Sequence, residues 1–200
     1  MLRRILRRHD RGIVEGTRLI VGLGNPGSER TGDRHNAGFQ VLDRLADQHK
    51  LPLDRLEFKG LLARGTIGGE PVILLKPLSY MNLSGSVVKP VLNRYQVELE
   101  HVLIVHDDLD LPLGMIRIRA SGGSGGHRGM ESIITSLGTE SIARLRIGIG
   151  RSDGEPPEEY VLENFSPEQS FTMEAAYEKA VAATVCFVEA GVDVAMNDYN

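Results

Sequence analysis

The chain has 200 residues, of which 41% are hydrophobic, and this length and apolar content suit one compact domain. Its single cysteine, Cys186, excludes a disulfide framework within the chain, and its apolar neighbours are typical of a structural cysteine. No stretch approaches the roughly 20 continuous apolar residues that cross a bilayer, so we expect a soluble protein of the cytoplasm without membrane partners.

The net charge of −4 is spread unevenly along the sequence. Residues 115–151 contain six arginines and two glutamates, whereas residues 152–200 contain one lysine and eleven acidic residues. A protein that is acidic overall therefore has a basic segment, which is able to bind a polyanion. The alternative interpretation is a solvated surface without a ligand.

Residues 1–17 are a basic extension, and residues 18–200 are the expected single domain. The extension lacks the apolar stretch of a secretory signal. A short amphipathic helix, a targeting segment and an extension from an upstream start codon are alternative interpretations. We expect a disordered arm.

The first half of the domain begins with a buried strand at residues 19–23, which glycines and Pro26 end sharply. Apolar residues at helical spacing predict a helix over residues 36–48. Residues 61–67 and 71–75 flank Gly68 and Gly69, a composition typical of a β-hairpin. A second helix is predicted from about Leu83 to Tyr95.

The second half alternates strands and helices. Strands are predicted at residues 102–105, 115–119 and 145–149, and the glycine-rich loop 121–126 leads into a helix near residues 130–137. Ser166, Pro167 and Gln169 have the pattern of a capping box that starts a long helix to about Ala190. The fold class is therefore α/β, a single globular domain with a mixed, mostly parallel twisted sheet and helices on both faces.

The glycines at positions 22, 24 and 27 formally match a dinucleotide-binding fingerprint. In that motif the helix starts within the glycine turn, whereas here Pro26 and further polar residues delay the helix to about Asn36. No acidic residue ends a second parallel strand at the expected distance. The sequence therefore argues against a nucleotide cofactor.

Four polar residues at the ends of predicted elements are the candidates for catalysis: Asn25, His35, Asn82 and Asp107. No serine lies in a nucleophile elbow, and the closely spaced ligands of residues 106–110 point to opposite faces of a strand, so neither a serine nucleophile nor a metal is expected. A general-base dyad of His35 and Asp107 acting on water remains. The alternative is that each residue only caps its helix or turn.

Five segments together resemble the successive signatures of bacterial peptidyl-tRNA hydrolase: residues 21–27, 34–38, 76–85, 106–112 and 125–129. Residues 144–150 and 195–197 fit the same family, and the resemblance covers residues 18–200. It implies an esterase that hydrolyses the bond between a peptide and the 3′-terminal ribose of tRNA, without metal or cofactor. The implied partner is peptidyl-tRNA, through its acceptor stem and CCA end, and the implied form is a monomer.

The resemblance also implies roles for particular residues. His35 would be the general base, Asp107 its orienting acid, and Asn25 the residue that distinguishes peptidyl-tRNA from aminoacyl-tRNA. The remaining candidates would bind substrate or tRNA: Tyr80, Met81, Asn82, Arg30, Arg117, Arg119, Arg128 and Arg146. For Tyr80 and Met81, core packing is the alternative. The glycine loop is either a phosphate cradle or a mobile gate.

Three positions depart from the family pattern. Arg128 replaces a usual asparagine, Arg30 a common tyrosine, and Asp33 a common threonine. These departures affect the expected substrate contacts and leave the dyad intact. Two other functions remain open at this point: a non-hydrolytic RNA-binding relative, similar to plant organellar splicing factors, and a dinucleotide oxidoreductase.

Overall fold

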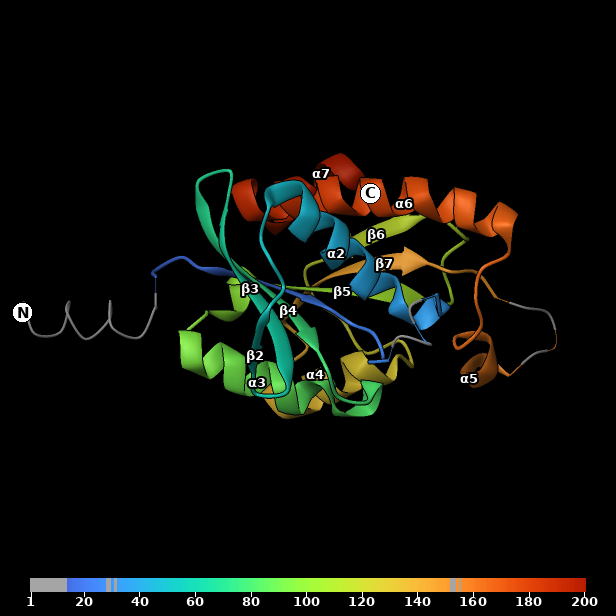
Figure 1. Cartoon of the computed structure of the whole chain (residues 1–200), viewed down its shortest axis with the longest axis horizontal. Helices are drawn as coiled ribbons and strands as arrows, with labels where there is room; N and C mark the ends of the chain where they lie inside the picture. The colour runs from blue at the N-terminus through green and yellow to red at the C-terminus, as the bar shows by residue number, and fades with distance from the viewer. Residues whose placement is uncertain (1–13, 28–29, 31, 152–153, 155) are drawn as a thin grey trace, which may run out of the picture.

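The computed structural model describes residues 14–27, 30, 32–151, 154 and 156–200. A seven-stranded sheet lies between two layers of helices (Figure 1). Its strands are β1 (Arg18–Gly22), β2 (Arg55–Glu57), β3 (Gly60–Ile67), β4 (Glu70–Pro77), β5 (Val102–Asp108), β6 (Ile116–Arg119) and β7 (Ala143–Gly148). The strand order is β2-β3-β4-β1-β5-β7-β6.

The sheet is mixed but mostly parallel in direction. β1 pairs in parallel with β4 and β5, and β5 pairs in parallel with β7. The pairs β2–β3, β3–β4 and β6–β7 are antiparallel, so only β3 and β6 run against the other strands. The predicted fold class is confirmed, and the carboxyl ends of the central strands meet at one edge, where α/β sheets bind ligands.

Helices cover both faces of the sheet, as the sequence predicted (Figure 1). On one face lie α2 (Ala37–His49), α6 (Pro167–Ala190) and α7 (Val192–Tyr199), and on the other lie α3 (Ser84–Tyr95) and α4 (Arg128–Leu137). Short helical segments are η2 (Arg34–Asn36), η3 (Met81–Leu83), η4 (Leu99–His101) and α5 (Pro157–Tyr160). None of the described helices is long and apolar enough to cross a membrane.

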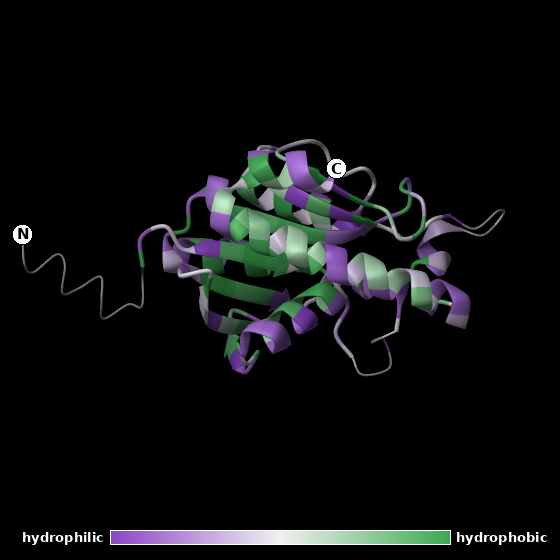
Figure 2. Ribbon diagram, turned by 90° about the horizontal axis from the view of Figure 1, so that it is seen from above, coloured by the Kyte–Doolittle hydropathy of each residue, from purple (hydrophilic) through white to green (hydrophobic). Residues whose placement is uncertain are grey.

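Each face of the sheet has its own core. Along β1, Ile20 packs in the cluster that includes α2 and α6, whereas Leu19 and Val21 pack in the cluster that includes α3 and α4. Burial on both faces explains why this strand is a continuous apolar run. In Figure 2 the strands are accordingly green, and purple residues lie mainly on the outer surfaces of the helices.

Most predicted elements are confirmed, and their ends differ by a few residues. The capping box of α6 is present, since the Ser166 side chain accepts the Gln169 N–H and the Gln169 side chain accepts the Ser166 N–H. β5 extends through Asp108, so Asp107 lies inside the strand rather than after it. The sequence did not predict β2, α5 and α7. The expectation of a disordered arm concerns mainly residues 1–13, which lie outside the described residues.

Close packing of α2 on the sheet determines where His35 lies. A Cβ atom at Gly38, in the first turn of α2, would overlap the carbonyl oxygen of Val105 and the backbone of Leu23. A Cβ at Gly22 would likewise overlap the carbonyl of Gly38. These glycines let the start of α2 contact the carboxyl ends of β1 and β5, which brings the preceding η2 segment over the end of β5.

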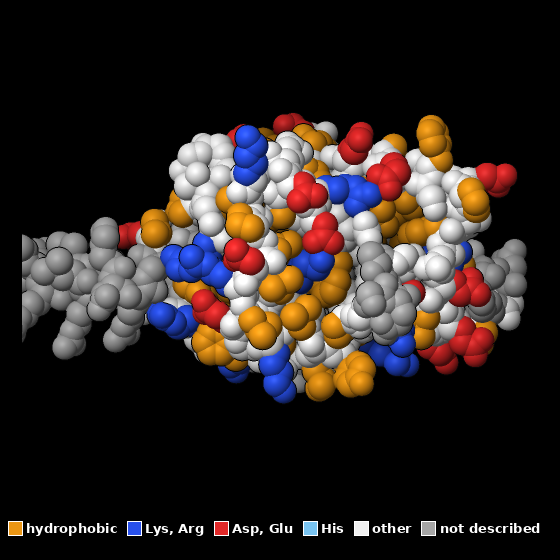
Figure 3. Space-filling view, in the orientation of Figure 1, with side chains coloured by type: hydrophobic (Ala, Val, Ile, Leu, Met, Phe, Trp, Pro, Cys, Tyr) orange, Lys and Arg blue, Asp and Glu red, His pale blue; other side chains and the backbone are white. Residues whose placement is uncertain are grey.

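Charged side chains of both signs are interspersed on the face of the molecule that Figure 3 shows. Acidic side chains gather there at the end of the molecule where α5 lies. This agrees with the acidic composition of residues 152–200. The arginine-rich residues 115–151 lie on β6, β7 and around α4, which makes this region the candidate basic surface for a polyanion.

Candidate active site

A cleft of about 580 Å³ opens at the carboxyl edge of the sheet. The structure brings eight of the sequence-predicted residues together in its lining: Asn25, Arg30, His35, Tyr80, Met81, Asn82, Asp107 and Arg128. The other three predicted residues, Arg117, Arg119 and Arg146, lie on β6 and β7 and do not line the cleft. The cleft therefore combines the polar candidates, and the strand arginines form a separate group.

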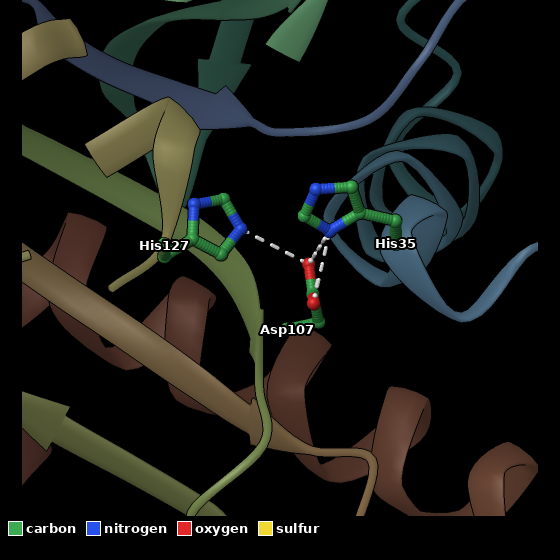
Figure 4. A group of neighbouring side chains, drawn as sticks. All are labelled: His35, Asp107 and His127. Carbon is green, nitrogen blue, oxygen red and sulfur yellow. Dashed lines mark hydrogen bonds and ion pairs between the residues drawn. The ribbon is translucent and has the colours of Figure 1, made fainter. Parts of the chain in front are cut away.

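His35 and Asp107 form a buried pair at the base of the cleft. The Nδ1 atom of His35 lies 2.9 Å from Oδ1 and 3.0 Å from Oδ2 of Asp107 (Figure 4). A carboxylate only accepts hydrogen bonds, so Nδ1 carries the proton and donates it. The other ring nitrogen of His35, Nε2, points away from Asp107 (Figure 4). In the neutral imidazole this atom holds a lone pair, which is the requirement for a general base.

The charges of this pair shift both pKa values. Burial lowers the pKa of His35. The Asp107 carboxylate and its hydrogen bond raise this pKa by more than burial lowers it, so it lies above the ordinary value of 6.5. Burial raises the pKa of Asp107, but His35 and His127 hold it well below its usual range. Asp107 is therefore a carboxylate throughout the physiological pH range and stabilises a protonated His35.

His127 is a second histidine on Asp107, and the sequence reasoning missed its role. Its Nε2 atom lies 3.1 Å from Asp107 Oδ1 (Figure 4), and its Nδ1 atom accepts the backbone N–H groups of Gly129 and Met130 at the start of α4. Because backbone N–H groups only donate, the proton lies on Nε2, which donates to Asp107. A histidine three residues before the helix predicted near residues 130–137 was the available signal, since N-cap residues accept such bonds.

His35, Asp107 and His127 also satisfy the distances of a metal site, since their ligand atoms lie within 4.8 Å of one another. The sequence pattern points only to possible ligands within residues 106–110. Nε2 of His127 would have to release its proton to bind a cation, while Nδ1 is occupied by two N–H donors. The hydrogen bonds therefore favour a site for proton transfer over a site for a metal.

His106 packs behind His127, on the opposite face of β5 from Asp107. Its ring meets the His127 ring at 4.6 Å between centroids, in an edge-to-face arrangement. Its Nδ1 atom donates to the Asp107 carbonyl oxygen at 2.6 Å, and burial lowers its pKa to about 3. His106 is therefore neutral at pH 7 and supports His127 without adding charge to the cleft.

Asn36 fixes the loop that carries Asn25. Its side chain accepts the Asn25 N–H at 2.7 Å and donates to the carbonyl oxygens of Asn25, at 3.2 Å, and Arg30, at 2.7 Å. Asn25 in turn accepts the Met81 N–H through Oδ1 at 3.3 Å. This leaves the amide NH₂ group of Asn25 to donate into the cleft. The sequence reasoning did not identify Asn36, because its partners are distant backbone atoms.

Arg34 fixes the position of one wall of the cleft relative to His35. The buried guanidinium donates to the Asn164 carbonyl oxygen at 2.9 Å and lies 4.2 Å from the centre of the Tyr160 ring. The backbone N–H of His35 donates to the Val161 carbonyl oxygen at 2.8 Å. Val161 and Leu162 line the cleft, so these contacts fix the apolar wall relative to His35.

Tyr80 and Met81 have different surroundings although they are neighbours. Tyr80 is 75% exposed at the cleft, whereas Met81 is 5% exposed and belongs to the core beneath α3 and α4. Core packing is therefore correct for Met81, which also lines the cleft, and incorrect for Tyr80. Asn82, in η3, is exposed beside them. An exposed aromatic ring next to an amide is able to contact a nucleobase.

Four arginines share one face of the β6–β7 pair. Arg117 lies opposite Arg146, and Arg119 lies opposite Arg144, and residues directly opposite in neighbouring strands point to the same face. Arg146 pairs with Asp108 at 2.5 Å, and Arg117 donates to the Asn200 carbonyl oxygen at 3.3 Å. Arg119 is exposed and makes no hydrogen bond or ion pair to the described part of the chain.

Arg144 differs from the other three because it is buried. It donates to the carbonyl oxygens of Gly122, of Gly123 at 2.8 Å and of Glu140 at 3.0 Å. It therefore fixes the first part of the glycine loop that leads to His127. Gly125 and Gly126 in the rest of the loop have positive φ values, and both interpretations of the loop, a phosphate cradle and a mobile gate, stay predictions.

Residues 19–200 match the family model of peptidyl-tRNA hydrolase. A protein of that name from Geobacillus thermodenitrificans is 48% identical over 185 residues, which cover 92% of this chain and 99% of the relative. The namesake from Syntrophomonas wolfei is 46% identical over 183 residues, or 92% of this chain and 100% of the relative. The crystal structure of peptidyl-tRNA hydrolase from Acinetobacter baumannii has a TM-score of 0.87 and 40% identity, covering 94% of this chain and 96% of that chain.

Proposed function

This chain belongs to the peptidyl-tRNA hydrolase family, and we propose that His35 is the general base that activates water against the ester of peptidyl-tRNA. One observation carries the proposal: Asp107 accepts the Nδ1 proton of His35, which leaves Nε2 as the acceptor on the side away from Asp107. The family activity, hydrolysis of the ester between peptide and tRNA, requires an acceptor of this kind for a proton of water.

The reaction follows from this geometry in two steps. In the first step, Nε2 of His35 takes a proton from water, and the water oxygen forms a bond to the ester carbonyl carbon. In the second step, the tetrahedral intermediate collapses, the bond to the ribose 3′-oxygen breaks, and the imidazolium returns its proton to that oxygen. Asp107 stabilises the transient imidazolium. His127, as a second donor, holds the Asp107 carboxylate in place.

Asn25 recognises the peptide part of the substrate through its NH₂ group, which is left to donate because Oδ1 accepts the Met81 N–H. In Asn25→Asp, a carboxylate oxygen still accepts this N–H, but both donors are lost. We expect KM for N-acetyl-aminoacyl-tRNA to rise by about tenfold, which corresponds to the loss of a hydrogen bond of roughly 1–2 kcal/mol. Steady-state kinetics measure the change.

The matched control for this variant is Asn93→Asp, because Asn93 is an exposed residue of α3 outside the cleft lining. It changes the charge of the protein equally, and its KM should equal that of the wild type. A KM that stays unchanged in Asn25→Asp would show that the Asn25 amide does not contact the substrate.

The tRNA part of the substrate extends from the cleft over β6 and β7. Tyr80, Asn82 and Arg30 line the cleft around His35, which supports a role in binding the CCA end. Three strand arginines share the face beside it and are placed to bind phosphates of the acceptor stem: Arg117, Arg119 and Arg146. Phosphate contacts carry little sequence information, so one protein would bind many tRNAs.

Arg119 gives the sharpest test of the tRNA surface, since it has no partner within the described residues. In Arg119→Gln, we expect tRNA affinity to fall by a similar factor for different tRNAs, and the slope of log K against log salt to decrease in magnitude by about one. Titrations of tRNA at several salt concentrations measure both. Arg55→Gln, on exposed β2, is the charge-matched control. If the slope of log K against log salt stayed unchanged in Arg119→Gln, Arg119 would not be part of the tRNA-binding surface.

Release of an N-acetylated amino acid from tRNA is the experiment that tests the function. We expect turnover of N-acetyl-aminoacyl-tRNA and little turnover of aminoacyl-tRNA with a free α-amino group. An RNA-binding protein without hydrolase activity would bind tRNA and release nothing. The dinucleotide alternative finds no support, since α2 begins at Ala37, outside the glycine turn.

We also propose that the active form is a monomer, as the resemblance to the family implies. We also place its activity in the cytoplasm, where ribosomes release peptidyl-tRNA. Residues 18–200 would form the catalytic domain, and residues 1–17 would be dispensable for hydrolysis.

A further inference from the structure

Among the residues that the structure describes, the cleft contains one arginine without an acidic partner. Arg30 lies 3.5 Å from the Asp33 carboxylate, and Arg151 lies 2.6 Å from that of Asp110. Arg128 lines the same cleft and is exposed, yet it makes no hydrogen bond and no ion pair with the residues that the structure describes. Its guanidinium is therefore the cleft cation that remains available to a ligand.

Arg128 is also close to the reacting groups. It directly follows His127, which donates to Asp107, and it is the first residue of α4. Its positive charge acts on the His35 ring and lowers the pKa of His35, against the larger effect of Asp107 and a smaller one of Asp33. The same charge also acts on a substrate group that is bound over His35.

We propose that Arg128 is a catalytic residue that stabilises the negative charge formed on the ester carbonyl oxygen when water attacks. The inference rests on the proposed role of His35, because that role places the carbonyl carbon next to the water on Nε2. The ester is neutral before attack, and its carbonyl oxygen becomes an anion in the tetrahedral intermediate. A guanidinium strengthens its hydrogen bonds to that oxygen as the charge develops.

This assignment separates Arg128 from the arginines of β6 and β7. A cation that binds a phosphate interacts equally with the substrate and the transition state, so its loss raises KM. A cation that binds the developing oxyanion interacts mainly in the transition state, so its loss lowers kcat.

Arg128→Gln and Arg128→Lys are the informative variants, assayed with N-acetyl-aminoacyl-tRNA over a range of pH and salt. In Arg128→Gln, which removes the charge and keeps an amide donor, we expect kcat to fall by about 10- to 100-fold and KM to change by less than about twofold. Arg128→Lys should recover part of the loss. The acid limb of the pH profile should move to higher pH in Arg128→Gln, because a cation that lowers the pKa of His35 is removed.

Arg55→Gln is the control, because Arg55 is an exposed residue of β2 outside the cleft lining. Its kcat and KM should equal those of the wild type. A raised KM with unchanged kcat and a weaker salt dependence would overturn the proposal in favour of a phosphate contact. Unchanged kcat and KM would overturn it as well. Failure of the proposed function would give a different result. In that case the wild type would not release the N-acetylated amino acid, or His35→Asn would keep full kcat.

Discussion

His35→Asn should lower kcat for N-acetyl-aminoacyl-tRNA by about 10²- to 10⁴-fold, the usual contribution of a general base. An asparagine amide is able to donate to Asp107 much as Nδ1 of His35 does, at 2.9 Å, so the buried carboxylate keeps a donor. It offers no nitrogen lone pair to water. Because the strand arginines are untouched, tRNA binding should be preserved, and steady-state kinetics with a tRNA titration measure both properties.

The control for this variant is His101→Asn, at a partly exposed histidine of η4 outside the cleft lining. Its kcat should equal that of the wild type. If His35→Asn retained full kcat, a different group would be the base, and the proposed mechanism would be wrong. If tRNA binding were lost together with kcat, the variant would have damaged the fold, and thermal unfolding would show this.

Asp107→Asn has the second large expected effect, a loss in kcat on the order of 10³- to 10⁴-fold. The asparagine NH₂ group would donate to Nδ1 of His35 and move the ring proton to Nε2, which removes the acceptor that faces water. The loss in kcat therefore has two causes: the His35 ring adopts the wrong tautomer, and the negative charge that stabilises the imidazolium is removed. It should appear in kcat with little change in KM, since Asp107 is buried beneath the substrate.

The same variant changes the pH dependence in a defined direction. His35 must be neutral to act, so activity is lost as the pH falls through its pKa, which lies above 6.5 in the wild type because Asp107 raises it. Without the carboxylate, burial lowers the pKa, and the acid limb of kcat/KM should move to lower pH. Asp110→Asn, at an exposed carboxylate outside the cleft lining, should leave the limb in place. An unshifted limb in Asp107→Asn would mean that another group controls it.

The sequence predicted the dyad because its two residues occupy the ends of regular elements. Apolar runs end at Leu23 and Val105, and parallel strands share one carboxyl edge, so polar residues beyond both runs meet there. His35 joins them because α2 starts late after the glycine turn. These relations follow from local patterns and from the rules of α/β topology.

The supporting residues escaped prediction because their roles depend on tertiary contacts. His127 reaches Asp107 only because the start of α4 approaches the end of β5 across the other face of the sheet. Asn36 bonds to backbone atoms of a loop eleven residues earlier, and Arg34 to a segment about 130 residues later. The missed elements β2 and α5 contain only three and four residues, too few to show a period.

The strand arginines show a similar limit. Alternation along β6 correctly places Arg117 and Arg119 on one face. It does not reveal that Arg146 is paired with Asp108 or that Arg117 contacts Asn200. It also does not reveal that the Arg144 side chain is buried and donates to a carbonyl oxygen of the glycine loop. Pairing depends on neighbouring strands, and it decides which arginine charge remains for a phosphate.

The most direct test of the central claim, that His35 and Asp107 act as one unit on water, is the single-turnover rate of ester hydrolysis in a double-mutant cycle. Wild type, His35→Asn, Asp107→Asn and the double variant would be compared on N-acetyl-aminoacyl-tRNA. Because neither residue works without the other, we predict that the double variant is no slower than the slower single variant. Losses that multiply in the double variant would show that the two residues act independently and would contradict the account.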